Sequence, residues 1–489
     1  MEKIFFLGFS IYIGMILGSC ISYIFIDSIG RKRILIIIVP INIIFLCTYK
    51  FLNPDFGEWI LYLVYINFFI SGFCSQIIVV TMIIYICEII KQSNIPVFVI
   101  IIITGIPLSN LIGTLLFNIR NLDWRNILLI IAGINAVIYF VMIFKLVRSP
   151  IFSLNNELFE PFIFDLIELA KRNKLNLDLN DFSFLLPYIN NETRITIRKK
   201  YDRMNKESIR SLNAINRVSL LDEINNSENN EDEEESLFND SSKSNNFLLK
   251  EDYLLNNDES EGKLKLIGKL KMKDYSPIDL LRFEKQIKNF LNLSFFWTIT
   301  MLIKNGINLK SKYIQRLHEE IYWNVFNIIL EIFSYFIILI IFLNPKLDMQ
   351  QPLVFYQIIS FIIFLILYYI DLDKNETLKI ILMFLGRFCW TSLYAIIFII
   401  TSIIYPIMIR TKGLGWNNAF GFLGVIIEII LTEYSYLKNE ITLFLILIFF
   451  SLILSYGLPK KIGTFILESP SIINHREKEE KEEKEENLD

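Results

Sequence analysis

The stretch IFIDSIGRKRILIIIV, from Ile24 to Val39, places one acidic residue, one glycine and three cations between two apolar blocks. The block before it is Ile4–Ile26 and the block after it is Ile34–Leu52. Each has close to the roughly 20 apolar residues that a helix needs to cross a bilayer. A carboxylate at a helix end, a glycine that permits a tight turn and clustered cations can tie neighbouring helix ends together. The stretch therefore predicts a short, charged turn between two membrane-spanning helices.

The same apolar pattern recurs along the chain and predicts an all-α membrane protein. Lys304 interrupts one of the blocks, which is the least apolar of the set. A polar gap separates five blocks from six later ones, so we expect roughly eleven spans. The nine further blocks are Ile60–Ile90, Ile95–Asn118, Ile127–Leu146, Asn289–Leu309, Val325–Leu343, Leu353–Ile370, Leu378–Ile403, Leu414–Leu431 and Ile441–Leu458.

Composition excludes several classes of protein. The 489 residues are 53% hydrophobic and 20% charged, and the charges gather in a central stretch and a tail, unlike those of a soluble enzyme. A net charge of −3 gives no indication of a nucleic-acid partner. The 5 Cys lie in apolar blocks without a CxxC pair and the 2 His are isolated, so no metal site is predicted. No paired carboxylates in a span, HExxH, Ser/His/Asp set or phosphate loop occurs, so we expect neither an enzyme nor a cofactor.

The blocks divide the chain into four parts. We expect a first membrane half at 1–148, a loop at 149–288 containing an acidic disordered insert, a second membrane half at 289–459 and a charged tail at 460–489. Lys and Arg in most short loops fall on one side under simple alternation, and the loops Arg120–Arg125 and Lys310–Arg316 are exceptions. This predicts that the central loop and the C-terminus are cytoplasmic. Two stretches of the loop, Leu158–Leu169 and Ser276–Phe290, are predicted to be amphipathic helices.

The charged turn resembles the signature loop between the second and third spans of the major facilitator superfamily. The matching residues are Asp27, Gly30, Arg31, Lys32 and Arg33, although Tyr23 and Ser28 replace a glycine and an arginine of the pattern. Further resemblances follow in the family's order, and they are most similar to its organic cation/anion (sugar-transporter-like) branch. They comprise Glu88, Asp123-Trp124-Arg125, Arg148-Ser149-Pro150, Asn292 to Trp297 with Asn305-Gly306, Glu331 to Tyr335, Gly386-Arg387-Phe388, Tyr405-Pro406 to Arg410 and Leu458-Pro459.

The resemblance implies two helical bundles, of five and six visible spans, around a central cavity. It also implies a gating role for the signature loop, Glu88 and Arg410. Since the first visible span carries the family's second-span loop, the family's first span is missing. We expect upstream sequence to encode it.

Residues that could bind a solute lie inside the predicted spans. Glu331 is ionisable and lies one helical turn from Tyr335, so the two could face a cavity. A structural acid bonded between helices is the alternative for Glu331. The uncharged candidates, which could equally hold helices together, are Trp297, Asn305, Gln76, Asn110, Tyr394 and Asn417. Ile403 and Phe422 stand where the family has charged residues, so no preference for solute charge is carried over.

Two functions remain open from the sequence. The first is secondary active or facilitative transport of a small organic solute, an organic ion or a sugar-like molecule, by alternating access. A coupling ion, a proton or sodium, could accompany it. The second is a non-transporting receptor or interaction scaffold in the membrane. The acidic insert, and Ile403 at a position where the family has an acidic residue, favour this alternative.

Overall fold

The computed structural model describes most of the membrane-spanning sequence. The described residues are 2–52, 59–90, 94–117, 123–155, 158–173, 197–199, 201, 284–315, 320–343, 350–369, 376–405, 407–434 and 437–458. The acidic insert, the charged tail and the part of the predicted helix Ser276–Phe290 that precedes Glu284 lie outside them.

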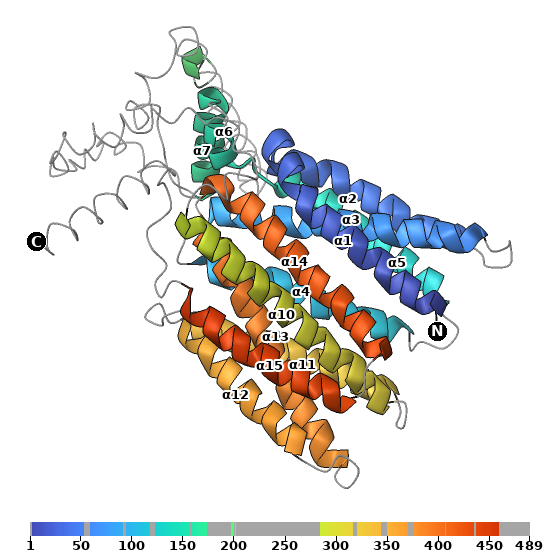
Figure 1. Cartoon of the computed structure of the whole chain (residues 1–489). Coiled ribbons are helices and arrows are strands. Elements are labelled where there is room, and N and C mark those ends of the chain that lie inside the picture. The colour runs from blue at the N-terminus through green and yellow to red at the C-terminus, as the bar shows by residue number, and fades with distance from the viewer. Residues whose placement is uncertain are drawn as a thin grey trace, which may run out of the picture. The chain divides into compact units, whose positions relative to one another are not determined.

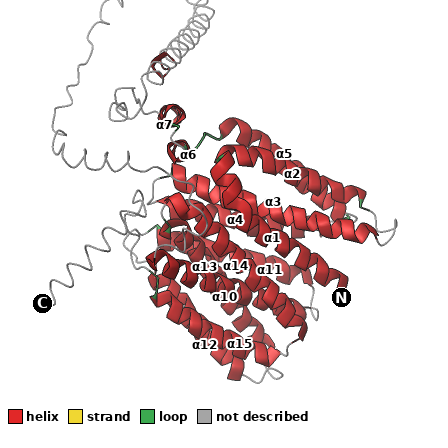
Figure 2. Cartoon of the chain, turned by 45° about the horizontal axis from the view of Figure 1, so that its top comes forward, coloured by secondary structure: helices red, strands yellow, loops and turns green. Residues whose placement is uncertain are grey.

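Helices account for all the regular structure that the described residues contain, and Figure 2 shows no strand among them. The predicted all-α class is therefore confirmed. The long helices of the first half are α1 (Glu2–Ile29), α2 (Arg31–Thr48), α3 (Trp59–Ile89), α4 (Ile95–Phe117) and α5 (Trp124–Lys145). Those of the second half are α10 (Glu284–Gln315), α11 (Glu320–Phe342), α12 (Gln350–Tyr369), α13 (Glu376–Ile404), α14 (Ile407–Tyr434) and α15 (Leu437–Tyr456). The shorter helices are η1 (Tyr49–Phe51), α6 (Pro150–Asn155) and α7 (Phe159–Arg172).

Each of the eleven predicted blocks coincides with one long helix. Within the described residues, nine of these helices are long and apolar enough to cross a membrane. The apolar part of α15 is shorter, Glu440–Tyr456, and α10, which contains Lys304, is not among the nine. Large apolar side chains such as Val137, Phe140 and Phe144 of α5 are mostly exposed, as expected for a surface that faces lipid.

Helix packing in the first half depends on small residues. In Figure 1, α1, α2, α3 and α5 lie together, and α1 and α2 both contact α3. Gly14 and Gly18 of α1 lie so close to the backbone carbonyls of Phe69 and Phe73 in α3 that a Cβ atom would clash there. Such close approach is typical of membrane helices, where van der Waals packing replaces the hydrophobic effect between helices.

The two most extensive contacts between the halves are those of α1 with α14 and of α4 with α11. Within the bundle, α14 lies between α1 and α10 and contacts both (Figure 1). Gly415 of α14 lies next to the backbone oxygen of Ser19 in α1, where a Cβ would come within 2.6 Å of that oxygen. Smaller contacts of α3 and α4 with α13, and of α3 with α14, complete the interface between the halves.

Contacts divide the chain into two compact units. One comprises Met1–Asn155 and Asp274–Asp489, and the other comprises Asn156–Lys273. In the second unit, Ile163, Phe164 and Ile167 of α7 form a small apolar cluster with Ile197. The predicted helix at Leu158–Leu169 is thus present as α7, with its apolar residues packed on one cluster.

Candidate functional site

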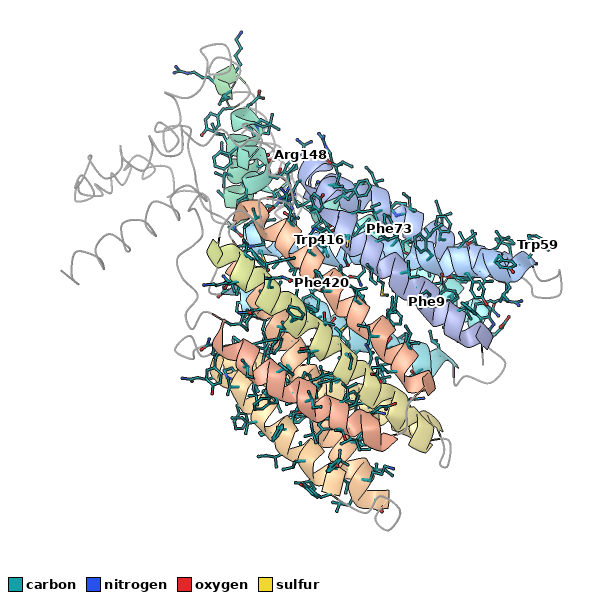
Figure 3. The ribbon with its side chains drawn as sticks, in the orientation of Figure 1. Phe9, Trp59, Phe73, Arg148, Trp416 and Phe420 are labelled. Carbon is teal, nitrogen blue, oxygen red and sulfur yellow. The ribbon has the colours of Figure 1, made fainter. Side chains whose placement is uncertain are left out.

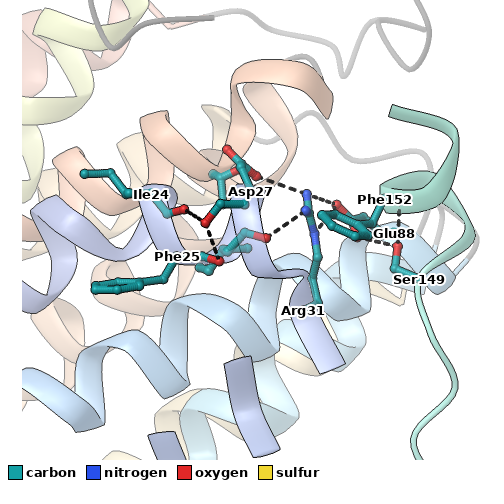
Figure 4. Close-up of polar contacts among 10 residues, drawn as sticks. Ile24, Phe25, Asp27, Arg31, Glu88, Ser149 and Phe152 are labelled. Atoms are coloured by element: carbon teal, nitrogen blue, oxygen red, sulfur yellow. Dashed lines mark hydrogen bonds and ion pairs between the residues drawn. The ribbon is translucent and has the colours of Figure 1, made fainter. Parts of the chain in front are cut away.

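The charged turn of the sequence forms a buried ion pair. The guanidinium of Arg31 donates to Oε1 of Glu88 from Nε at 3.0 Å and from Nη2 at 2.7 Å. A second carboxylate, that of Asp27, lies 3.3 Å from the same Nη2. Arg31 also donates to the carbonyl of Ile26 in the last turn of α1, which accepts from the backbone N–H of Gly30 as well. Figure 4 shows Arg31 between the two acids. The turn thus ties the ends of α1 and α2 to the end of α3.

The connection after α5 completes this cluster. Oγ of Ser149 donates to Oε2 of Glu88 at 2.5 Å, so both carboxylate oxygens are engaged. The ring of Phe152, in α6, lies 5.0 Å from the Arg31 guanidinium (Figure 4). We call Asp27, Arg31, Glu88, Ser149 and Phe152 the latch cluster, and the end of the bundle that holds it the basic end. Arg148 marks this end in Figure 3 and the exposed Trp59 marks the opposite end.

Gly30 makes the sharp turn from α1 to α2. Its φ of 94° and ψ of 149° lie in a region that only glycine adopts readily. A Cβ on Gly30 would also come within 2.9 Å of the Phe152 ring. The turn and the aromatic contact with Arg31 therefore both require glycine at this position.

We expect Gly30→Ala to destabilise the purified protein by about 1–3 kcal/mol, the usual range for a strained backbone conformation. Thermal unfolding in detergent, followed by tryptophan fluorescence, measures the change. Gly105→Ala is the matched control, because Gly105 is helical and a Cβ there meets no atom within 4 Å. Equal melting temperatures for the two variants would contradict the role of Gly30.

Polar contacts between the halves continue from the latch cluster toward the middle of the bundle. Thr411 of α14 donates to Oδ1 of Asp27 at 3.0 Å. Further along α14, Nδ2 of Asn418 donates to Oε1 of Gln76 in α3 at 2.7 Å and lies 3.4 Å from Oγ of Ser19 in α1. All of these groups except Asp27 are buried. The interface between the halves is thus bonded by side chains at the basic end.

A second charged cluster lies within the second half. Nζ of Lys304 in α10 donates to Oε1 of Glu331 in α11 at 2.8 Å. The hydroxyl of Tyr335 donates to the same oxygen at 3.0 Å, and Nη2 of Arg387 in α13 lies 3.7 Å from Oε2. We call Lys304, Glu331 and Arg387 the charge triad. The exposed fractions of their side chains are 12%, 7% and 10%, respectively. Three charged groups from three helices are therefore largely buried.

Aromatic side chains surround the Lys304 side of the charge triad. The ammonium of Lys304 lies 4.0 Å from the ring centroid of Tyr394. Trp297 packs edge-on against Tyr394 at 5.8 Å and donates from Nε1 to Thr401 at 2.9 Å. Four of the predicted cavity residues, Glu331, Tyr335, Trp297 and Tyr394, therefore gather in one place.

The other predicted residues lie elsewhere. Asn417 accepts from Ser294 at 2.8 Å and donates to Tyr405 at 2.5 Å, and Gln76 belongs to the bonded interface between the halves. Asn305 donates to a carbonyl of its own helix. The side chain of Asn110 is exposed on α4.

The remaining predicted residues of the signature loop lie at the margin of the latch cluster. Lys32 is half-buried and Arg33 is exposed, whereas Arg410 is buried and donates to the carbonyl of Tyr405 at 3.2 Å.

Several residues of these clusters were not among the predicted site residues. Lys304 and Arg387 complete the charge triad, and Ser149 and Thr411 complete the bonding at the basic end. The sequence does mark Lys304 and Arg387, because burying a charged side chain in a membrane span is energetically costly and therefore indicates a functional role. Nothing in the sequence marks Ser149 or Thr411 as partners of distant acids. Within the described residues, no group of three or more His, Cys, Asp or Glu could hold a metal ion.

The comparisons with known proteins agree with this architecture. The sequence model of the Major Facilitator Superfamily matches residues 4–428. A solved structure of the proton:xylose symporter XylE bound to 6-bromo-6-deoxy-D-glucose is similar over 95% of this chain and 88% of that chain, with 12% identity and a TM-score of 0.61. Two inward-open structures of XylE from E. coli, one of them partially occluded, give TM-scores of 0.54 and 0.57, with 13% and 11% identity. Each covers 94% of this chain, and the chain covers 87% and 89% of them. A sequence comparison with curated proteins gives no match. With a family match over most of its length and eleven long helices in the family's arrangement, the chain belongs to the major facilitator superfamily of small-solute membrane transporters.

Proposed function

We propose that the protein carries a sugar-like or other small organic solute across the membrane by alternating access, and that the solute binds beside the charge triad. The observation that carries the proposal is the burial of Lys304, Glu331 and Arg387 in membrane-spanning helices. Ionisable groups inside spans are costly and mark solute or ion pathways. Transporters of this architecture bind their solute near the midplane, between the two halves.

The residues next to the charge triad suit a small polar molecule once the halves open. Tyr335 and Tyr394 carry phenol groups and Trp297 carries a flat apolar ring, and all three side chains are buried in the structure. Hydroxyl and charged donors fix the orientation of a polar ligand, whereas aromatic faces cover its carbon skeleton. The solved XylE structure contains a bound sugar derivative, which supports a sugar-like solute as the first choice to test.

The latch cluster and the bonded interface supply the gate in this proposal. When the basic end opens, α14 must leave α1 and α3, so the bonds of Thr411 to Asp27 and of Asn418 to Gln76 must break. We propose that this end is cytoplasmic, because most of the short loops that carry Lys and Arg residues lie there. The latch cluster would then stabilise the state that is closed toward the cytoplasm.

Uptake into proteoliposomes tests the proposal. We expect saturable uptake of at least one solute from a panel of pentoses, hexoses, sugar acids and amino sugars, above the level in protein-free vesicles. XylE is a proton symporter, so the first coupling ion to test is a proton, by imposing an inward pH gradient. Binding of a solute without any flux would instead favour the receptor alternative, for which no structural observation speaks.

A further inference from the structure

The charge triad contains an excess of positive charge. Lys304 and Arg387 contribute two cations, and Glu331 contributes one carboxylate. Both ion pairs of the triad are with Glu331, and another buried carboxylate, that of Glu428 in α14, lies against Gly306 of α10. The three residues of the charge triad thus have a formal net charge of +1 among membrane-spanning helices, where an uncompensated charge is strongly unfavourable.

The guanidinium of Arg387 has unused capacity to donate hydrogen bonds. Its Nε is buried and has no hydrogen-bond partner among the described residues, although the side chain as a whole retains only 10% of its exposure. Its nearest contact to Glu331, at 3.7 Å, is longer than a hydrogen bond. A guanidinium has five N–H donors in a planar fork that matches a carboxylate.

The ammonium of Lys304 is oriented toward the same carboxylate. It donates to Glu331 Oε1 at 2.8 Å and lies over Tyr394, which leaves one or more of its three donors for another acceptor. Glu331 therefore accepts from Lys304 and lies against Arg387 at the same time, and holds the two cations near each other. In this arrangement Glu331 is a positioning residue.

We propose that the transported solute bears a negatively charged group, such as a carboxylate, which binds to Lys304 and Arg387 and neutralises the excess charge. A neutral solute would leave the excess in place and a cationic solute would increase it. An anionic group offers charge-assisted hydrogen bonds to both cations, which are stronger than bonds between neutral groups. The inference rests on the proposed function, since it names the solute class of the same site.

Two matched series of solutes test the inference in proteoliposomes. One series is glucuronate, glucose and glucosamine, and the other is benzoate, benzyl alcohol and benzylammonium. Within each series the ring is constant while the charge changes from negative to neutral to positive. All members are supplied together at equal concentration, and the vesicle contents are quantified by mass spectrometry. Membrane leakage is subtracted with protein-free vesicles.

For the wild-type protein we expect the anionic member of at least one series to be taken up about tenfold or more in excess of the neutral member. Lys304→Gln is expected to abolish this preference, because it removes the excess charge. Lys304→Arg should retain it. Lys145→Gln is the matched control, since Lys145 is exposed at the end of α5. Melting temperatures show whether each variant is folded.

The uptake experiment distinguishes a failure of the anion inference from a failure of the proposed transport function. Preference for the neutral or cationic member, or an anion preference that survives Lys304→Gln unchanged, overturns this inference and leaves the proposed transport function intact. Uptake by the folded wild-type protein of no member of either series, and of no member of the panel of pentoses, hexoses, sugar acids and amino sugars, overturns both.

Discussion

Arg31→Met is expected to destabilise the protein by about 3–5 kcal/mol, the range for removing one partner of a buried ion pair. The variant leaves the carboxylate of Glu88, a residue that is 8% exposed, with the Ser149 hydroxyl as its one hydrogen-bond donor among the described residues. It also leaves Asp27 without the guanidinium at 3.3 Å. Methionine preserves much of the apolar stem of arginine, so the effect reports the charge rather than lost packing.

A double-mutant cycle separates the ion pair from its surroundings. Glu88→Met alone should destabilise the protein by a similar amount, because it leaves the Arg31 guanidinium buried without this carboxylate. The combined Arg31→Met/Glu88→Met variant should recover more than half of the loss, since two apolar side chains replace two charges. Thermal unfolding in detergent gives the comparison. Additive losses in the double variant would show that Arg31 and Glu88 act independently.

The thiol of Cys87 provides a second measurement for the same variants. It is buried and lies 3.8 Å from the carbonyl oxygen of Ser402 in α13, at the interface between the halves. With the other four cysteines replaced by serine, we expect a water-soluble maleimide to label Cys87 at least about tenfold faster when Arg31 is methionine, because about 1.4 kcal/mol of bias toward opening suffices for that change. Unchanged labelling in a destabilised variant would limit the latch cluster to a structural role.

The sequence was sufficient to predict the helices and insufficient to predict their contacts. Long apolar blocks leave a bilayer-spanning helix as the only stable choice, so each block became one helix. In the sequence Lys304 only interrupts an apolar block, whereas in the structure it forms the closest ion pair of the charge triad. Glu331 and Tyr335 were predictable as a pair, because residues four apart share one face of a helix.

Contacts between helices depend on rotation and crossing, which no local pattern encodes. Neighbouring residues illustrate this limit. Lys304 bonds Glu331 across to α11, whereas Asn305 bonds the carbonyl of Met301 in its own helix. Asn110 is as polar as Asn417, yet the first is exposed and the second is fully buried between two partners. Polarity within a span could therefore mark candidates without showing which of them meet.

Glu331→Gln is expected to reduce solute uptake by about 100-fold or more, which corresponds to roughly 2.8 kcal/mol. The variant leaves the Lys304 and Arg387 cations near each other without the carboxylate that lies between them. Their repulsion raises the energy of the folded state and separates their donors, so a solute no longer meets a convergent site. The measurement is initial uptake by proteoliposomes, with the melting temperature recorded for each variant.

Stability and transport should separate in a second variant. Lys304→Gln/Glu331→Gln returns the site to a single cation, Arg387, so its net charge equals that of the wild-type triad. We therefore expect most of the lost stability to return while uptake remains low, because the ordered pair of cations is absent. Tyr335→Phe is a milder comparison, because it removes one hydrogen-bond donor to Glu331 without changing the charge of the site. We expect it to lower the free energy of unfolding by about 1.5–3 kcal/mol. If uptake recovered together with stability in the double variant, Glu331 would serve the fold alone, and the solute would have to bind away from the charge triad.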